Sequence, residues 1–370
     1  MAKLKSVTTM RHNLKKKVAI LYSGGRYFGG IEKYLVNLFN NIDGEKFELT
    51  LLSLGEWQLT KQMAKQGHKV IALNGKRIRL GSINEIGEYL KNNQYSLLVS
   101  QGVVANTYAR IVSFKYKIPN LVTVHSDLSG DYSNPLIRIA YELIDRFTRR
   151  QTSKYIAVSE FIKRKLVKSG ISAKKISVIY NGLDFRQSKP RPHKRLVIGS
   201  AGRLHPVKGY DLLIQAFAEM KNKRLRLKIA GVGVELDNLQ KLAQDLGVSS
   251  RVEFIGFEKD IYKFLDTIDV YVQSSKSEGF GLAVVEAMAQ AMPVVVTPAG
   301  SLREIVKNGK TGYISADFEP TSIAMAISLA VENYESSKQI GENAKKYVTE
   351  NFDIKQWVEN TEKVFEDSCR

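Results

Sequence analysis

The sequence has almost no cysteine, since Cys369 is the only one among 370 residues. A single thiol excludes an intramolecular disulfide and a cysteine-based metal cage, and it fits a reducing compartment. Apolar runs are also too short to span a membrane, and residues 1–17 lack the apolar stretch of a signal peptide. These absences predict a cytoplasmic protein.

Histidine is scarce as well, with 5 residues in the chain. His12, His68, His193 and His205 show no metal-ligand spacing, and no Asp-x-Asp pair is present to hold a divalent ion on nucleotide phosphates. We therefore expect no essential metal and no bound cofactor.

Acidic residues are rare in the first half of the chain. Residues 1–185 carry 30 Lys and Arg against 13 Asp and Glu, a net charge of +17, whereas residues 186–370 carry a net +2. Within the first half, the stretch 138–175 holds 11 basic residues against 3 acidic ones. Each cluster alone fits a solvated face, but the whole half predicts an anionic partner such as lipid, nucleic acid or a phosphorylated ligand.

What the sequence does contain is a repeated alternation of short apolar strands and amphipathic helices. This alternation predicts parallel sheets covered by helices on both faces. Residues 185–194, with two prolines and several basic residues, read as a linker between domains 1–184 and 195–351. The expected fold class is α/β, with two doubly wound Rossmann-like domains facing each other across a cleft.

The segment SSKSEGFGLAVVE, residues 274–286, places glutamates on both sides of a turn between a strand and a helix. Free N–H groups at the helix start favour an anion, and Gly279 and Gly281 allow it to approach closely. Glu278 at the mouth and Glu286 further along the helix would bind hydroxyl groups. The pattern suggests a phosphorylated, polyhydroxylated ligand, although a helix-start Glu and a partly buried Glu also occur for structural reasons.

Two cations follow the first strand of the second domain, in AGRLHPVKG. An arginine such as Arg203 can bind two phosphate oxygens with its fork, and a lysine such as Lys208 adds a point charge, so the pair suits a diphosphate. In the first domain, Gly29 and Gly30 precede a helix without the lysine and serine of a P-loop. His125 ends another strand and could orient a ligand hydroxyl. Each of these residues also has an ordinary structural interpretation.

Together the segments GGIEKYL, VHSDL, YIAVSE, YNGLD, AGRLHPVKGYDLLIQAF and EGFGLAVVEAMAQAMPVVV resemble a family of retaining glycosyltransferases, the GT4-type enzymes of GT-B fold. The similarity runs from about residue 16 to residue 365. Its most specific part is the E-x7-E spacing of Glu278 and Glu286, with Arg203 and Lys208 upstream. The resemblance implies that the last helix, about 352–370, crosses back to the first domain.

The resemblance also implies a role for each candidate residue. Arg203 and Lys208 would neutralise the diphosphate of a nucleotide sugar, Glu286 would bind the ribose hydroxyls, and Glu278 would contact the transferred sugar. His125 would face the sugar near the reacting carbon. Gly29 and Gly30, with the backbone of Gly281, Leu282 and Ala283, would complete the phosphate cradle.

The activity implied is metal-independent transfer of a sugar with retention of configuration, from a UDP-sugar or, second, GDP-mannose. The acceptor would be a lipid-linked molecule or a glycan in bacterial cell-surface polysaccharide or lipopolysaccharide biosynthesis, and the basic first domain would dock on the anionic inner face of the plasma membrane. Departures from the family pattern at Ser274, Ser275, Ala291 and 299–302 lie beside the donor pocket and leave the donor open.

The sequence leaves three alternative functions open. A catalytically silent GT-B subunit would keep the fold without the reaction, and a sugar-nucleotide epimerase would form product without an acceptor. A nucleic-acid-binding protein is suggested by charge alone and lacks a reading motif, so we expect no nucleic-acid partner.

Overall fold

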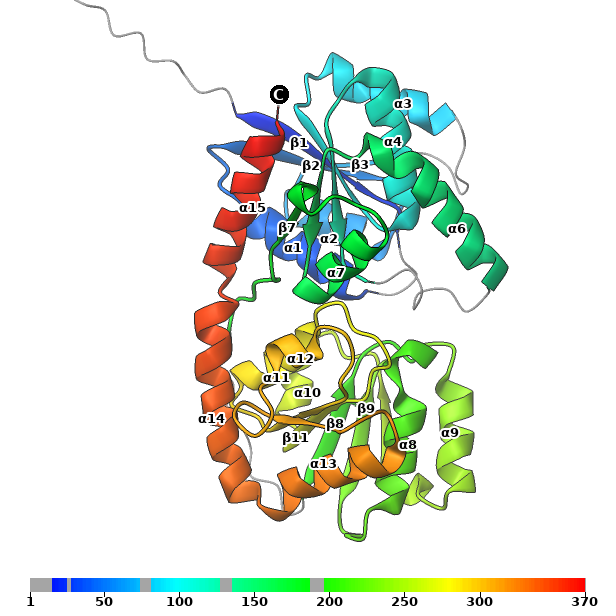
Figure 1. Cartoon of the computed structure of the whole chain (residues 1–370), viewed down its shortest axis with the longest axis vertical. Coiled ribbons are helices and arrows are strands. Elements are labelled where there is room, and N and C mark those ends of the chain that lie inside the picture. Colours follow the sequence, from blue (N-terminus) through cyan, green and yellow to red (C-terminus); the bar gives the residue numbers. More distant parts are fainter. Residues whose placement is uncertain (1–14, 25–27, 74–80, 127–134, 187–195, 370) are drawn as a thin grey trace, which may run out of the picture.

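The computed structural model describes residues 15–24, 28–73, 81–126, 135–186 and 196–369 (Figure 1). These residues form two parallel sheets, each covered by helices on both faces, so the expected doubly wound α/β architecture is confirmed. Most of the predicted linker and the basic segment 1–14 lie outside the described residues. No helix among the described residues combines the length and the apolar character needed to cross a bilayer.

The first sheet has the strand order β3-β2-β1-β4-β5-β6-β7. Its strands are β1 Lys16–Tyr22, β2 Phe47–Ser53, β3 Val70–Ala72, β4 Leu97–Gln101, β5 Asn120–Val124, β6 Lys154–Ala157 and β7 Ile176–Val178. Its helices are α1 Gly30–Asn41, α2 Gln58–Lys65, α3 Gly81–Asn92, α4 Val103–Tyr116, α6 Pro135–Thr148 and α7 Glu160–Lys168, with short 3-10 turns η1 Arg149–Gln151 and η2 Ala173–Lys175. Val18 and Ile20 of β1 enter one core while Ala19 and Leu21 enter the core on the opposite face.

The second sheet has the order β10-β9-β8-β11-β12-β13. Its strands are β8 Val197–Ala201, β9 Arg226–Ala230, β10 Val252–Gly256, β11 Val270–Gln273, β12 Val294–Val296 and β13 Tyr313–Ile314. Its helices are α8 Tyr210–Glu219, α9 Leu236–Asp245, α10 Ile261–Leu265, α11 Leu282–Ala289, α12 Leu302–Ile305 and α13 Pro320–Glu332, with η3 Pro206–Lys208 and η4 Ser249–Arg251. Strand order reverses beside β1 and beside β8, and ligands of such sheets bind at the carboxyl ends near this reversal.

Two consecutive helices run along both domains on one side of the molecule (Figure 1). Helix α14, Tyr334–Asn351, packs on α11 of the second domain, and α15, Ile354–Ser368, packs on α1 of the first. Trp357 and Phe365 of α15 belong to the first domain's core. At the crossing, the Leu183 amide donates to the Phe352 carbonyl over 3.0 Å. A Cβ atom on Gly182 would lie 2.5 Å from Trp357 and 2.8 Å from Ile354, so only glycine fits there.

Polar contacts also join the two domains beside the cleft. The Ser159 hydroxyl donates to the Gly279 carbonyl over 2.7 Å. The Glu304 carboxylate in α12 accepts from the Glu160 amide at 3.0 Å, from Arg164 at 2.8 Å and from the Tyr180 hydroxyl at 3.2 Å. Because Glu304 binds three groups of the other domain, it helps to set the relative position of the two sheets.

Candidate functional site at the domain cleft

A cleft of about 1420 Å³ lies between the two domains. All ten residues singled out in the sequence line it: Gly29, Gly30, His125, Arg203, Lys208, Glu278, Gly281, Leu282, Ala283 and Glu286. The first three belong to the first domain and the other seven to the second domain. The fold therefore brings together residues up to about 250 positions apart in the sequence.

The starts of helices α1 and α11 meet across this cleft. A methyl group on Gly30 would lie 3.5 Å from Leu282 Cδ1, which shows how closely the two helix starts approach. Gly281 caps α11 with φ of 91°, a left-handed conformation that favours glycine. Helix N-termini carry unpaired N–H groups and partial positive charge, so their convergence creates a place for an anion.

Lys208 and Glu278 form an ion pair at the second domain's edge of the cleft. Lys208 Nζ lies 2.6 Å from Glu278 Oε2, and the Ser275 hydroxyl donates to the same oxygen over 3.2 Å. The sequence placed Lys208 on phosphate and Glu278 on sugar hydroxyls without pairing them. Arg203 is exposed in the same cleft, so it can meet an incoming phosphate without first leaving a buried site.

Glu286 is paired with a residue from the opposite domain. Its side chain is buried, and Lys33 of α1 reaches across the cleft to Glu286 Oε1. Burial lowers the pKa of Lys33 to about 8, and the two side chains offset each other's charge inside the protein. Lys33 is absent from the sequence-based candidates, because nothing in its local pattern indicates a partner on the other domain.

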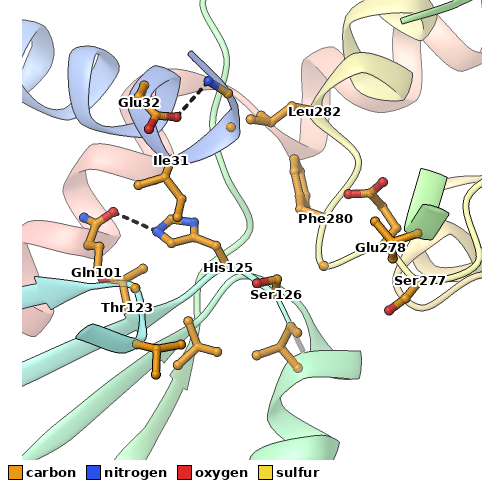
Figure 2. A pocket seen from close by; sticks show the side chains of 18 of the residues that line it. Ile31, Glu32, Gln101, Thr123, His125, Ser126, Ser277, Glu278, Phe280 and Leu282 are labelled. Carbon is orange, nitrogen blue, oxygen red and sulfur yellow. Dashed lines mark hydrogen bonds between the residues drawn. The ribbon is translucent and has the colours of Figure 1, made fainter. Parts of the chain in front are cut away.

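The glycine turn before α1 is held by Glu32. The Gly29 N–H donates to Glu32 Oε2 over 2.7 Å, which is the dashed line at Glu32 in Figure 2. The buried Tyr22 hydroxyl donates to Glu32 Oε1. Burial beside Glu32 raises the pKa of Tyr22, so the phenol keeps its proton and remains a donor. Glu32 thereby fixes the backbone at the start of α1, a role the sequence did not reveal.

His125 lies on the floor of the cleft and is neutral. Burial lowers the pKa of His125 to about 3. Its Nε2 lies 2.8 Å from Gln101 Oε1, and the amide oxygen accepts, so Nδ1 remains as an acceptor on the ring (Figure 2). Tyr34 packs edge-on against the imidazole at 4.7 Å and fixes its plane.

The first and second domains meet closely behind His125. A Cβ on Gly279 would overlap the His125 carbonyl oxygen, so glycine is required in the turn that precedes α11. Figure 2 shows Glu278, Phe280 and Leu282 facing Ile31 and His125 across the space. The site therefore offers two helix starts suited to an anion, the cations Lys33, Arg203 and Lys208, the carboxylates of Glu278 and Glu286, and the neutral imidazole of His125. This set suits a phosphorylated ligand with hydroxyl groups.

The family models match both halves of the chain. Residues 28–187 match "Glycosyltransferase Family 4" and residues 183–347 match "Glycosyl transferases group 1". The chain belongs to the GT4-type glycosyltransferases. Its ten cleft residues thus lie in the interdomain cleft of a sugar-transferring enzyme.

Known glycosyltransferases extend this result. The N-acetyl-alpha-D-glucosaminyl L-malate synthase of Bacillus anthracis is 26% identical over 361 residues, covering 85% of this chain and 93% of that protein. The lipopolysaccharide core biosynthesis glycosyltransferase LpsE of Rhizobium meliloti is 38% identical over 135 residues, covering 36% of this chain and 39% of that protein.

A solved structure establishes the fold of this glycosyltransferase. Anabaena HepE in complex with UDP and glucose superimposes with a TM-score of 0.83 at 22% identity, covering 95% of this chain and 99% of that one. The GT-B fold predicted from the sequence is confirmed.

Proposed function

We propose that this glycosyltransferase moves a sugar from a nucleotide-sugar donor to a lipid-linked or glycan acceptor, with retention of configuration and without an essential metal. The observation that carries the proposal is the convergence of Arg203, Lys208, Glu278 and Glu286 on one cleft opposite the start of α1. UDP is the favoured nucleotide and GDP-mannose the second candidate. HepE, whose structure contains UDP and glucose, supports this order.

In this proposal, each group acts on a different part of the donor. The helix starts at Gly30 and Gly281, with Arg203 and Lys208, stabilise the charge that develops on the leaving diphosphate. Glu286 accepts from the ribose hydroxyls and Glu278 from the hydroxyls of the transferred sugar. His125, neutral and with Nδ1 as an acceptor, orients a hydroxyl near the reacting carbon.

The chemical step we propose needs no protein nucleophile. The acceptor hydroxyl attacks the anomeric carbon from the face that the diphosphate leaves, the bond from that carbon to the phosphate oxygen breaks, and the departing phosphate takes the hydroxyl proton. The acceptor class follows from the basic first domain, which would dock on anionic lipid at the inner face of a membrane. LpsE, named for lipopolysaccharide core biosynthesis, favours a cell-surface glycan pathway.

The test is a nucleotide-release and thermal-shift panel over UDP-, GDP- and ADP-sugars in the presence of EDTA, with wild type and Glu286→Gln. We expect one donor to raise Tm and release nucleotide slowly, because a bound ligand stabilises by mass action, and the variant to lose both effects. Glu335→Gln, an 85% exposed carboxylate on α14, is the matched control and should behave as wild type.

Two outcomes would contradict parts of the proposal. If no donor binds, the chain is better described as a silent GT-B subunit. If the protein converts a donor into another nucleotide sugar without any acceptor, it is a sugar-nucleotide epimerase and the proposed transfer is wrong. For an active enzyme, NMR of the early product gives the anomeric configuration directly, and an inverted product would remove the retaining mechanism.

A further inference from the structure

Helix α6 exposes an unusual amount of apolar surface. Leu136, Ile139, Leu143, Ile144 and Phe147 are 75%, 47%, 50%, 39% and 78% exposed. At 3.6 residues per turn, Leu136, Ile139, Leu143 and Phe147 fall on one side of the helix, with Ile144 at the margin of this stripe. Isolated exposed apolar residues are ordinary, but a contiguous stripe of this kind marks an interaction surface.

The opposite, polar side of α6 is fixed to the protein. Arg110 of α4 is only 2% exposed, and its Nη1 donates to Asp145 Oδ1 at 2.7 Å and to the Thr148 hydroxyl at 3.2 Å. Its Nε donates to the Thr152 hydroxyl at 2.9 Å. A surface helix usually buries its apolar side. Here a buried guanidinium holds the polar side inward, so the apolar side faces solvent.

The stripe is continuous with the cleft and is bordered by positive charge. Ile139 and Leu143 line the cleft, and Leu136 and Phe147 extend the stripe to the two ends of α6. Figure 1 shows this helix at the edge of the first domain. Arg146 is exposed beside the stripe and also lines the cleft, and η1 follows immediately with the exposed Arg150. Glu142 is an exposed acidic residue on the same face.

We propose that α6 is the element that inserts into an anionic lipid surface, with its apolar stripe among the acyl chains and its arginines among the phosphates. A helix with an apolar side and basic borders lies in the interface plane of a membrane. The net charge of +17 in residues 1–185 favours binding to an anionic lipid surface over a neutral one. The inference rests on the proposed lipid-linked acceptor, which would enter the cleft along Ile139 and Leu143.

The experiment is cosedimentation of the full chain with vesicles of phosphatidylcholine alone or with phosphatidylglycerol added. Leu136→Ser/Phe147→Ser removes the two most exposed side chains of the stripe without touching Arg110 or Asp145. The matched control is Val234→Ser/Met325→Ser, which removes apolar side chains that are 72% and 71% exposed on the second domain. We expect the α6 variant to lose about tenfold or more in affinity for anionic vesicles, while the control binds as wild type.

Three results would overturn the proposal: no binding of wild type to anionic vesicles, equal binding of wild type and the α6 variant, or a concentration-dependent dimer that the α6 variant abolishes. The last would show a second copy covering the stripe. Each variant is first checked for an unchanged Tm and for UDP binding without vesicles. If UDP fails to bind even to wild type, the proposed transfer fails, and the vesicle result still decides the role of α6.

Discussion

At the scale of single residues, the Lys208–Glu278 pair has a consequence for nucleotide binding. Glu278 offsets the Lys208 charge at 2.6 Å, so it competes with a diphosphate for the same cation. We expect Glu278→Gln to bind UDP several-fold more tightly, as measured by calorimetry, while nucleotide release from the donor slows about 100-fold or more. Weaker UDP binding in this variant would show that Glu278 holds Lys208 in place for the diphosphate and does not compete with the diphosphate for it.

The cross-domain pair of Lys33 and Glu286 gives a stability prediction. Lys33→Met leaves the buried Glu286 carboxylate without its cation and should lower the free energy of unfolding by about 1–3 kcal/mol. Glu286→Gln in the same chain should restore much of this loss, because the charge is removed with its partner. Denaturant unfolding of the two single variants and the double variant measures the coupling; additive effects would mean that the pair contributes nothing.

The neutral state of His125 predicts a pH dependence of stability. Its pKa is about 3 in the folded chain and about 6.5 in the unfolded chain. The unfolded chain therefore binds more protons between these values, and stability falls as pH decreases from about 6.5 toward 3. Between pH 6.5 and pH 5, His125 should lower the free energy of unfolding by about 2 kcal/mol.

Unfolding of His125→Gln at both pH values should lack this loss. His68→Gln serves as the control, because burial lowers the pKa of His68 as well but this residue is not among those that line the cleft. A difference between pH 6.5 and pH 5 that is the same in wild type and His125→Gln would contradict the assignment.

The residues that the sequence predicted and those it missed differ in one respect. Glu278 and Glu286 lie on one turn and helix, so their spacing alone places them together, and Arg203 and Lys208 follow a strand whose end must reach the cleft. Lys33 contacts Glu286 of the other domain, Gln101 contacts His125 of a neighbouring strand, and Glu32 binds the backbone of the glycine turn. Each of these contacts depends on the tertiary structure. Local periodicity carries no information about such approaches, so these roles could not be read from the sequence.

At the scale of elements, the crossing of α15 over the first domain depends on Gly182. A Cβ atom there would lie 2.5–2.9 Å from Trp357, Ile354 and Asp353. Gly182→Ala should therefore destabilise the chain by about 1–3 kcal/mol, measured as a lower denaturation midpoint, because α15 must shift to make room. Gly44→Ala is the control, since no atom lies within 4 Å of the added Cβ. Equal denaturation midpoints for the two variants would show that α15 can shift at little cost in stability.

Helix α6 shows where reasoning about elements from sequence fails. Apolar residues that recur at helical spacing normally mark the side of a surface helix that packs on the core. The structure gives the helix but reverses its orientation, because Arg110 binds Asp145 and Thr148 on the polar side. Arg110 belongs to α4, 35 residues before Asp145, and no spacing rule links the two.

At the scale of the whole molecule, Glu304 connects the domains through Glu160, Arg164 and Tyr180. Glu304→Ala should loosen the contact between the two domains and increase the radius of gyration measured by X-ray scattering. The residues expected to bind the nucleotide, other than the α1 turn, lie on the second domain, so UDP affinity should change little while turnover falls. A large loss of UDP binding with unchanged scattering would instead mean that Glu304 acts locally.

The path of α14 and α15 has a consequence for the order of events during synthesis. All strands of the first sheet leave the ribosome long before Trp357 and Phe365, which complete the core behind that sheet. The second domain, by contrast, contains its own sheet and helices before α15 appears. The domain translated first is therefore expected to finish folding last, and until then its unfinished core is a target for chaperones and proteases.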